Sequence, residues 1–210
     1  MTIEISKISV ENIKNNQFQK ELPEVYDLKN VIENAAWHNH ESVFDHTLNV
    51  LETLQELLEN INPQIYTYLN QKINNHSKKE ILFLGTLFHD IAKGEVLIEN
   101  EGLTSCPGHE EMGSKKAKEI LDRLDLSDLE KDLIVKIVKH HGEMHGILDP
   151  KNDKREEQLS KLKTNHSDIY LELVLLAMAD TLGSQLKINN PHEYQFRADY
   201  YYRLIKEPLF

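Results

Sequence analysis

The sequence predicts an all-α domain, and three features support this fold class. Apolar residues recur every three or four positions through most of the 210-residue chain, which is the periodicity of an amphipathic helix. The alternating β-branched residues that are typical of strands are almost absent, and glycine and proline are sparse. Because a chain of this length can bury one substantial core, we expect a single bundle of about seven helices.

The predicted elements follow the chain in order. Residues 1–19 are polar and indicate a weakly structured extension, and residues 22–34 indicate a short helical entry. Two helix starts carry caps, since Ser42 precedes an apolar stripe and Ser127 forms a capping box with Glu130. Periodicity then predicts helices over residues 42–60, 63–74, 79–92, 113–124, 127–141, 167–188 and 192–206.

Two long polar segments separate these helices. Residues 94–108 contain three glycines and Pro107, and residues 142–166 are mostly polar, so both segments are predicted to be loops. We therefore expect the domain to span residues 20–190. Residues 191–210 are expected to form a C-terminal helix that packs on the same domain.

The bulk composition argues against several classes of partner. The formal net charge of −11 repels polyanions, so duplex nucleic acid is not expected as a partner. The apolar runs are too short to span a bilayer, and the N-terminus lacks the pattern of a secretory signal. The single cysteine, Cys106, rules out an internal disulfide framework. We expect a cytoplasmic protein without a membrane partner, and a homo-oligomer is compatible with the sequence.

An unusual polar pair ends the most apolar predicted helix. Residues 82–94 read LFLGTLFHDIAKG, so His89 and Asp90 follow a stretch that is apolar on every side. Such a helix is buried, and a buried carboxylate is costly unless it is paired or coordinates a metal. Taken alone, the two residues would be a satisfied polar pair at a helix terminus.

Two further polar residues lie in stretches that look buried. His46 is on the apolar face of its predicted helix, and Asp180 ends the run LVLLAMAD. Taken singly, His46 would be a core histidine, and Asp180 would be a helix cap or the partner of a buried cation. Together with His89 and Asp90 they form a mixed nitrogen and oxygen set that one divalent cation satisfies. Mn, Fe, Co, Ni or Zn suits such a set better than Ca.

The pattern His46 … His89-Asp90 … Asp180 resembles the HD-domain superfamily of metal-dependent phosphohydrolases. Six blocks are similar, in order, to the HD region of bacterial tRNA nucleotidyltransferases: LPE, HNHESVFDHTLNVLE, LFHDIAKG, GHEEMGSKKAKEIL, IVKHHG and LLAMADTLGS. The polymerase head of those transferases carries a Gly-Gly loop and paired aspartates, and this sequence has neither Gly-Gly nor Asp-x-Asp. The resemblance therefore implies a free-standing hydrolase that does not add nucleotides.

The resemblance also implies a ligand set for two metal ions. The first ion would be held by His46, His89, Asp90 and Asp180. The second would be held by His109 and His140, with Asp90 shared between the ions. His141 is the alternative to His140, since the spacing does not choose between them. Without a second ion, His109 and His140 would face solvent or contact substrate phosphate.

Other residues receive supporting roles. Lys93 lies one turn after the His-Asp pair and is predicted, with Asp90, to be catalytic by neutralising phosphoryl charge. A cation that interacts with the end of the helix dipole would explain Lys93 as well. The remaining predicted roles are substrate contact for Lys115 and His141, and support of the metal ligands for His40 and Glu41.

The predicted function is metal-dependent hydrolysis of a small phosphorylated substrate, by a water that one or two divalent transition-metal ions activate. Phosphomonoesters, nucleotides and 2′,3′-cyclic phosphates are the candidate substrates. Two alternatives share the fold: a di-iron oxygenase with much the same ligands, and a non-catalytic module that senses a nucleotide. Lys93 argues against the oxygenase, and the intact ligand set argues against the sensor.

Overall fold

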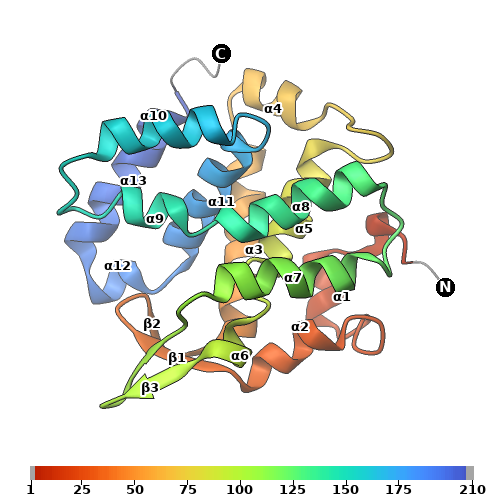
Figure 1. Cartoon of the computed structure of the whole chain (residues 1–210), viewed down its shortest axis with the longest axis horizontal. Coiled ribbons are helices and arrows are strands. Elements are labelled where there is room, and N and C mark those ends of the chain that lie inside the picture. Colours follow the sequence, from red (N-terminus) through yellow and green to blue (C-terminus); the bar gives the residue numbers. More distant parts are fainter. Residues whose placement is uncertain (1–2, 207–210) are drawn as a thin grey trace.

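Helices dominate the computed structural model, which describes residues 3–206 (Figure 1). The longer helices are α3 (Val43–Glu59), α4 (Pro63–Leu69), α5 (Lys78–Phe88), α7 (His109–Leu121), α8 (Asp128–His140), α10 (Arg155–Asn165), α11 (Tyr170–Gly183) and α13 (Pro191–Leu204). The shorter ones are α1 (Val10–Lys14), α2 (Pro23–Asp27), α6 (Lys93–Val96), α9 (Glu143–Ile147) and α12 (Leu186–Asn189), with 3₁₀ turns at Ile5–Lys7 and Leu28–Asn30. The all-α fold class predicted from the sequence is confirmed.

Two short antiparallel hairpins accompany the helices. Strands β1 (Ile32–Ala35) and β2 (His38–Ser42) form the first, and β3 (Ile98–Asn100) and β4 (Leu103–Ser105) form the second. The second hairpin projects from the helical body (Figure 1). Asn34 joins the two hairpins, because its backbone N–H donates to Thr104 Oγ1 and its side-chain amide donates to the Gly102 carbonyl.

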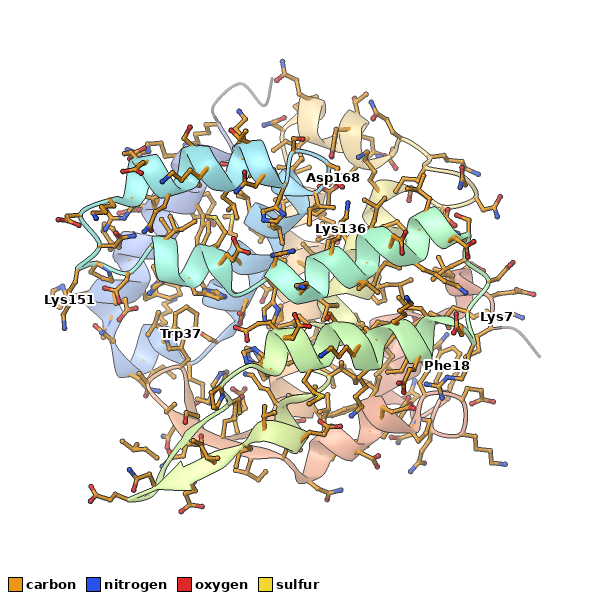
Figure 2. The ribbon with its side chains drawn as sticks, in the orientation of Figure 1. Lys7, Phe18, Trp37, Lys136, Lys151 and Asp168 are labelled. Atoms are coloured by element: carbon orange, nitrogen blue, oxygen red, sulfur yellow. The ribbon has the colours of Figure 1, made fainter. Side chains whose placement is uncertain are left out.

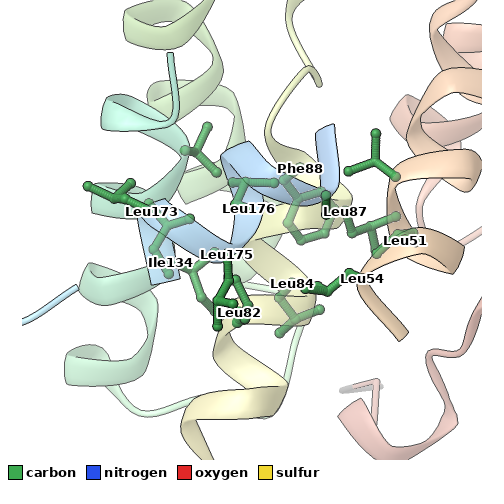
Figure 3. Packing of buried hydrophobic residues seen from close by; sticks show 14 of the residues in the cluster. Leu51, Leu54, Leu82, Leu84, Leu87, Phe88, Ile134, Leu173, Leu175 and Leu176 are labelled. Carbon is green, nitrogen blue, oxygen red and sulfur yellow. The ribbon is translucent and has the colours of Figure 1, made fainter. Parts of the chain in front are cut away.

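The hydrophobic core lies where α3, α5, α8 and α11 meet. Figure 3 shows leucines of α11 beside leucines of α5, with Ile134 of α8 and Leu51 of α3 next to them. Leu82, Leu175 and Ile134 are completely buried. Since burying a leucine or isoleucine side chain contributes about 1.5–3 kcal/mol, these contacts fix the relative positions of the four helices.

A glycine lets two of these helices approach closely. A Cβ atom added to Gly85 of α5 would lie 2.6 Å from Cγ2 of Ile137 on α8, which is closer than packed atoms allow. The absence of a side chain at this position therefore permits the approach. As a result, the ends of α5 and α8, which carry His89 and His141, lie side by side.

The chain before α2 is more ordered than the sequence predicted. Ser9 caps α1 by accepting a hydrogen bond from the Asn12 N–H, and Ile5, Val10 and Ile13 are buried in the core. These apolar residues are spaced too irregularly among polar ones to be recognised as a helix in the sequence. The domain boundaries proposed from the sequence stay a prediction.

Three further segments differ from the prediction. The entry over residues 22–34 ends in a hairpin strand, the loop over residues 94–108 contains α6 and the second hairpin, and the loop over residues 142–166 contains α9 and α10. Helix α10 was missed because only Leu159 and Leu162 of it are buried. Helix α13 matches the predicted C-terminal helix, whose last residues, 207–210, lie outside the described part of the chain. No helix within residues 3–206 is long and apolar enough to cross a bilayer.

Candidate metal centre

Asp90 lies at the centre of a buried polar cluster at the end of α5. His89 is the C-cap of that helix, and Asp90 is the residue that follows it. Both side chains are buried, with 0% of His89 and 2% of Asp90 exposed. The apolar residues of α5 therefore carry this acid and this imidazole into the interior.

Three imidazoles converge on the Asp90 carboxylate. The Nε2 atom of His89 lies 3.1 Å from Oδ2, and the Nε2 atoms of His109 and His141 lie 3.3 and 3.6 Å from Oδ1. His89 comes from α5, His109 opens α7, and His141 caps α8. Gly108, which precedes His109, has a φ of 76°, a backbone conformation that glycine adopts without strain.

Each of these three histidines is oriented by a backbone carbonyl. The Nδ1 atoms of His89, His109 and His141 lie 2.7, 2.8 and 2.7 Å from the carbonyl oxygens of Thr86, Cys106 and Val138, respectively. A carbonyl oxygen only accepts, so each Nδ1 carries the proton. In the neutral imidazole, Nε2 is then left with a lone pair that points toward Asp90. Metal-binding histidines are commonly oriented in this way.

Without an ion, the only counterpart of these nitrogens among residues 3–206 is the Asp90 carboxylate, which raises the pKa of His89 and of His109 although burial would lower both. The Nε2 atoms of His109 and His141 face each other at 3.2 Å, and His89 Nε2 has no hydrogen-bond partner among residues 3–206. Protonating two of the rings would place like charges about 5 Å apart, a repulsion of roughly 3 kcal/mol at an effective dielectric constant of about 20. A divalent cation would satisfy these nitrogens and Asp90 together, so the residues fit a metal ion.

A second group of ligands lies on the other side of Asp90. His46 of α3 places Nε2 3.0 Å from Oδ1 of Asp180 and 3.7 Å from Oδ2 of Asp90. Asp180 lies on α11, and its other oxygen is 2.8 Å from Nε2 of His145 on α9. The ligand atoms of His46, His89 and Asp90 lie within 4.8 Å of one another, as do those of Asp90, His109 and His141. Two triads that share Asp90 could therefore hold two ions.

We call the six residues His46, His89, Asp90, His109, His141 and Asp180 the inner centre. The buried negative charges around the inner centre also favour the binding of cations. Four buried carboxylates lie in or beside it: Glu33 and Asp90 contact the buried ammonium group of Lys93, and Glu41 and Asp180 contact histidines. The carboxylates outnumber the single ammonium group, and imidazoles supply their other contacts. Buried charges are tolerated only when they are paired or bound to a metal.

The electrostatic balance keeps the two aspartates ionised. Burial alone would raise the pKa of Asp90, but nearby His89 and Lys93 hold it well below its usual range. Burial would likewise raise the pKa of Asp180, but hydrogen bonds from His145 and His46 hold it well below its usual range. Both side chains are therefore anionic ligands at neutral pH.

Burial has the opposite effect on two of the imidazoles. It lowers the pKa of His46, although Asp180 partly offsets the effect, and it lowers the pKa of His141, although Asp90 partly offsets it. Both rings are therefore neutral at pH 7, which is the form that binds metals.

The structure brings together most of the residues that the sequence singled out. His46, His89, Asp90, His109 and Asp180 all lie in the inner centre. Their role as metal ligands stays a prediction, which these distances support.

The choice between the two adjacent histidines is a correction. His141 faces Asp90, whereas the predicted ligand His140 points to Glu143, with its Nδ1 atom 2.5 Å from Oε1. The helix makes this difference, because adjacent residues on a helix point in directions about 100° apart. The position of His141 fits a metal ligand instead of the substrate contact predicted for it.

The predicted supporting residues divide into near and distant ones. Glu41 accepts a hydrogen bond from His38 and lies 3.9 Å from His46 Nδ1, so it is placed to support a ligand. His40 is exposed on β2 with a φ of 51°. Lys115 is exposed and lies 3.3 Å from Glu111 on the same helix, so neither His40 nor Lys115 contacts the inner centre.

Lys93 lies at the inner centre, but its charge is already paired. Its Nζ atom is 2.9 Å from Oδ2 of Asp90 and 2.7 Å from Oε2 of Glu33. An ammonium group has three N–H donors, so these two contacts leave a third for a ligand. The predicted contact of Lys93 with a phosphoryl group stays a prediction.

Three residues near the inner centre were missed in the sequence: Glu33, His38 and His145. Glu33 and His38 belong to the first hairpin, whose strands were not predicted, so their buried positions could not be inferred. His145 belongs to α9, within a segment predicted as a loop. The only available signal was the high histidine content of the chain.

Comparison with known proteins agrees with this geometry. Residues 43–183 match a family described as the HD domain. The chain is 30% identical over 149 residues to a bifunctional uridylyltransferase/uridylyl-removing enzyme of Legionella pneumophila, covering 68% of this chain and 16% of that protein. It is 25% identical over 171 residues to the protein of the same name from Chromobacterium violaceum, covering 79% of this chain and 18% of that protein.

The chain thus spans about one sixth of the length of these relatives. The relatives are named uridylyltransferases, whereas the sequence blocks resembled tRNA nucleotidyltransferases, so both comparisons lead to nucleotidyltransferases with an HD region. The family match includes His46, the His89-Asp90 pair and Asp180. This chain therefore belongs to the HD-domain family, in the superfamily of metal-dependent phosphohydrolases.

Proposed function

We propose that this protein hydrolyses a phosphoester bond of a small, nucleotide-like substrate with the help of one or two divalent transition-metal ions. The observation that carries the proposal is the pair of ligand triads that share Asp90. When bound, such ions act as Lewis acids on a phosphoryl oxygen and lower the pKa of a bound water toward about 7.

Asp90 has the central role in this proposal. Its Oδ1 faces His109 and His141, and its Oδ2 faces His89 and Lys93, so each oxygen serves a different group of ligands. Asp90 would thus be a ligand in either triad. The contact with Lys93 neutralises part of its charge and fixes the orientation of the carboxylate.

The residues around the inner centre would hold the substrate in place. Lys93 has a third N–H donor that could hydrogen-bond a phosphoryl oxygen. His145 donates to Asp180 from the outer side, with 22% of its side chain exposed, and its ring packs edge-on against Trp37 at a centroid distance of 4.8 Å. Trp37 lies in the turn of the first hairpin, and Figure 2 shows it next to α9. We assign this side of the inner centre to the entry of the substrate.

The small size of the proposed substrate rests on charge. With a net charge of −11, the protein repels long polyanions, so attraction to phosphate must be local. The relatives are named for removing a uridylyl group, which adds uridylyl phosphoesters to the phosphomonoesters, nucleotides and 2′,3′-cyclic phosphates as candidate substrates.

The test is a phosphatase and phosphodiesterase assay with Mn²⁺, Co²⁺ or Ni²⁺ added to metal-free protein. The substrates are p-nitrophenyl phosphate, bis-p-nitrophenyl phosphate, uridine monophosphate and a 2′,3′-cyclic nucleotide. We expect metal-dependent hydrolysis of at least one substrate and a loss of about 100-fold or more in Asp90→Asn. The matched control is Asp132→Asn, which changes an exposed aspartate of α8.

Equal activity in the wild type and Asp90→Asn would refute the assignment of the site. Absence of hydrolysis with every metal, together with nucleotide binding, would favour the sensing module instead. Oxygen consumption by the iron-loaded protein would favour the oxygenase.

A further inference from the structure

A second cluster of metal-binding side chains lies outside the inner centre. It consists of His140 at the end of α8, Glu143 at the start of α9 and His166 at the C-cap of α10, and we call it the outer triad. One ligand atom from each residue lies within 4.8 Å of the other two. Three separate helices therefore direct one set of donors to one point at the surface.

Both imidazoles approach the same carboxylate oxygen. His140 Nδ1 lies 2.5 Å from Glu143 Oε1, and His166 Nε2 lies 3.7 Å from that atom. The two rings pack against each other with their centroids 4.1 Å apart. Ring packing against His140 and attraction to the Glu143 carboxylate orient His166, and a shared cation would bind all three donor groups together.

The surroundings hold the outer triad in place and leave it accessible. Lys136 of α8 forms an ion pair of 2.6 Å with Asp168, two residues after His166, which ties the chain after α10 to α8 (Figure 2). The exposed fractions of the His140, Glu143 and His166 side chains are 21%, 45% and 18%. An ion from solution could therefore reach the donors without a change in the fold.

The donor chemistry selects the type of ion. Two imidazoles and one carboxylate suit a borderline transition metal such as Zn²⁺, which binds these ligands tetrahedrally with water in the remaining position. Burial and the neighbouring His140 both lower the pKa of His166, so that ring is neutral and free to bind at pH 7. Mg²⁺ and Ca²⁺ prefer sets of oxygen ligands and are poor matches.

We propose that the outer triad is a second metal site, which binds one Zn²⁺ or similar transition-metal ion. An ion there would join α8, α9 and α10. It would also fix the junction between α8 and α9, which carries His141 of the inner centre on one side and His145 on the other. The site would thus couple metal supply at the surface to the geometry of the inner centre.

The test counts metal ions per chain after equilibrium dialysis of the full-length protein against Zn²⁺. We expect His166→Gln to bind one ion fewer than the wild type. His192→Gln is the matched control, because it removes an exposed histidine of α13, and we expect it to bind as many ions as the wild type. Glu143→Gln provides a second variant that should also lose this ion.

Circular dichroism establishes that each variant is folded before its ions are counted. If folded His166→Gln and Glu143→Gln both retain the wild-type number of ions, the outer triad is not a metal site. The count is a difference between variants and does not depend on catalysis. An inactive protein could therefore still confirm the outer triad, and an active one could still refute it.

Discussion

Helix α8 begins and ends beside a buried polar group, and the two ends are built in opposite ways. At the start, the Glu130 carboxylate is completely buried and accepts backbone hydrogen bonds from Asn75, His76 and Ser127 at 2.9, 2.8 and 2.8 Å. The Ser127 hydroxyl donates a fourth, also at 2.8 Å. Each carboxylate oxygen therefore has protein donors, and the charge needs no external partner.

At the other end of α8, only one of the two ring nitrogens of the buried His141 is paired with a backbone group. Its Nδ1 donates to a backbone carbonyl, but its Nε2 faces Asp90 and another imidazole nitrogen, that of His109. The contrast shows that burial of a polar residue does not by itself mark a functional site. Here the carboxylate that has a full set of protein donors stabilises the fold, and the imidazole nitrogens gathered around Asp90 indicate a ligand.

The largest effect that separates the two ends should be stabilisation by metal. An ion that binds only the folded state at about 100 times its Kd stabilises the protein by about 2.7 kcal/mol, or roughly 5–10 °C in Tm for a domain of this size. We expect Zn²⁺ or Mn²⁺ to raise the Tm of the wild type and of Glu130→Gln by similar amounts. The Tm of Asp90→Asn should rise much less. Thermal unfolding followed by circular dichroism measures these shifts.

Thermal unfolding of the same variants can also refute the contrast between the two ends of α8. Without metal, Asp90→Asn should itself lose stability at pH 7, because it removes the carboxylate whose pKa His89 and Lys93 lower in the folded state and leaves Lys93 with one partner fewer. If metal raises the Tm of Asp90→Asn as much as that of the wild type, Asp90 serves only its protein partners, as Glu130 does, and the distinction between the two ends would be wrong.

A smaller effect is expected at the start of α8, and it depends on pH. Burial would raise the pKa of Glu130, but hydrogen bonds from Ser127 and His76 lower it to about 2, from an ordinary value of 4.5. Because the pKa is lower in the folded state, the stabilisation is fully present above pH 4.5 and is lost as the pH falls toward 2. We expect Glu130→Gln to lose about 2 kcal/mol of unfolding free energy at pH 7.

The pH dependence provides the control for that prediction. Urea unfolding between pH 7 and pH 2 should show the stabilities of the wild type and Glu130→Gln converging at low pH. A constant difference over this range would show that the loss comes from altered packing and not from the charge of Glu130.

The sequence predicted those parts of the molecule that depend on local patterns. The capping box of Ser127 and Glu130 is present, and the long helices α3, α5, α8 and α11 lie close to their predicted positions. Apolar periodicity and caps are properties of neighbouring residues, so they can be recognised before the fold is known.

The parts that depend on distant contacts could not be predicted. Glu33 is buried only because its hairpin packs beside Lys93, 60 residues away in the chain. The choice of His141 over His140 depends on the rotation of α8, which the close approach of Gly85 to Ile137 helps to set. Family resemblance supplied most of the ligand set, but the side of a helix that a residue occupies requires the structure.

The smallest expected effect concerns Trp37, the single tryptophan of the chain. Its ring lies 4.8 Å from that of His145, which hydrogen-bonds Asp180 at 2.8 Å. A cation on Asp180 competes with this hydrogen bond, so the contact of His145 with the indole should change. We expect Zn²⁺ to produce a modest, saturable change in Trp37 fluorescence. The fluorescence change should persist in Glu130→Gln, because Glu130 lies at the other end of α8, where protein donors already satisfy the carboxylate.

Two variants then separate the sources of the fluorescence signal. Asp180→Asn should abolish the change, since it removes the carboxylate through which the inner centre contacts His145. His166→Gln should retain most of it, because it leaves the inner centre and Asp180 intact and reaches His145 only indirectly, through α9. If Asp180→Asn still responds to Zn²⁺ as the wild type does, the ion does not bind at Asp180, and the unsatisfied lone pairs near His141 would require another explanation.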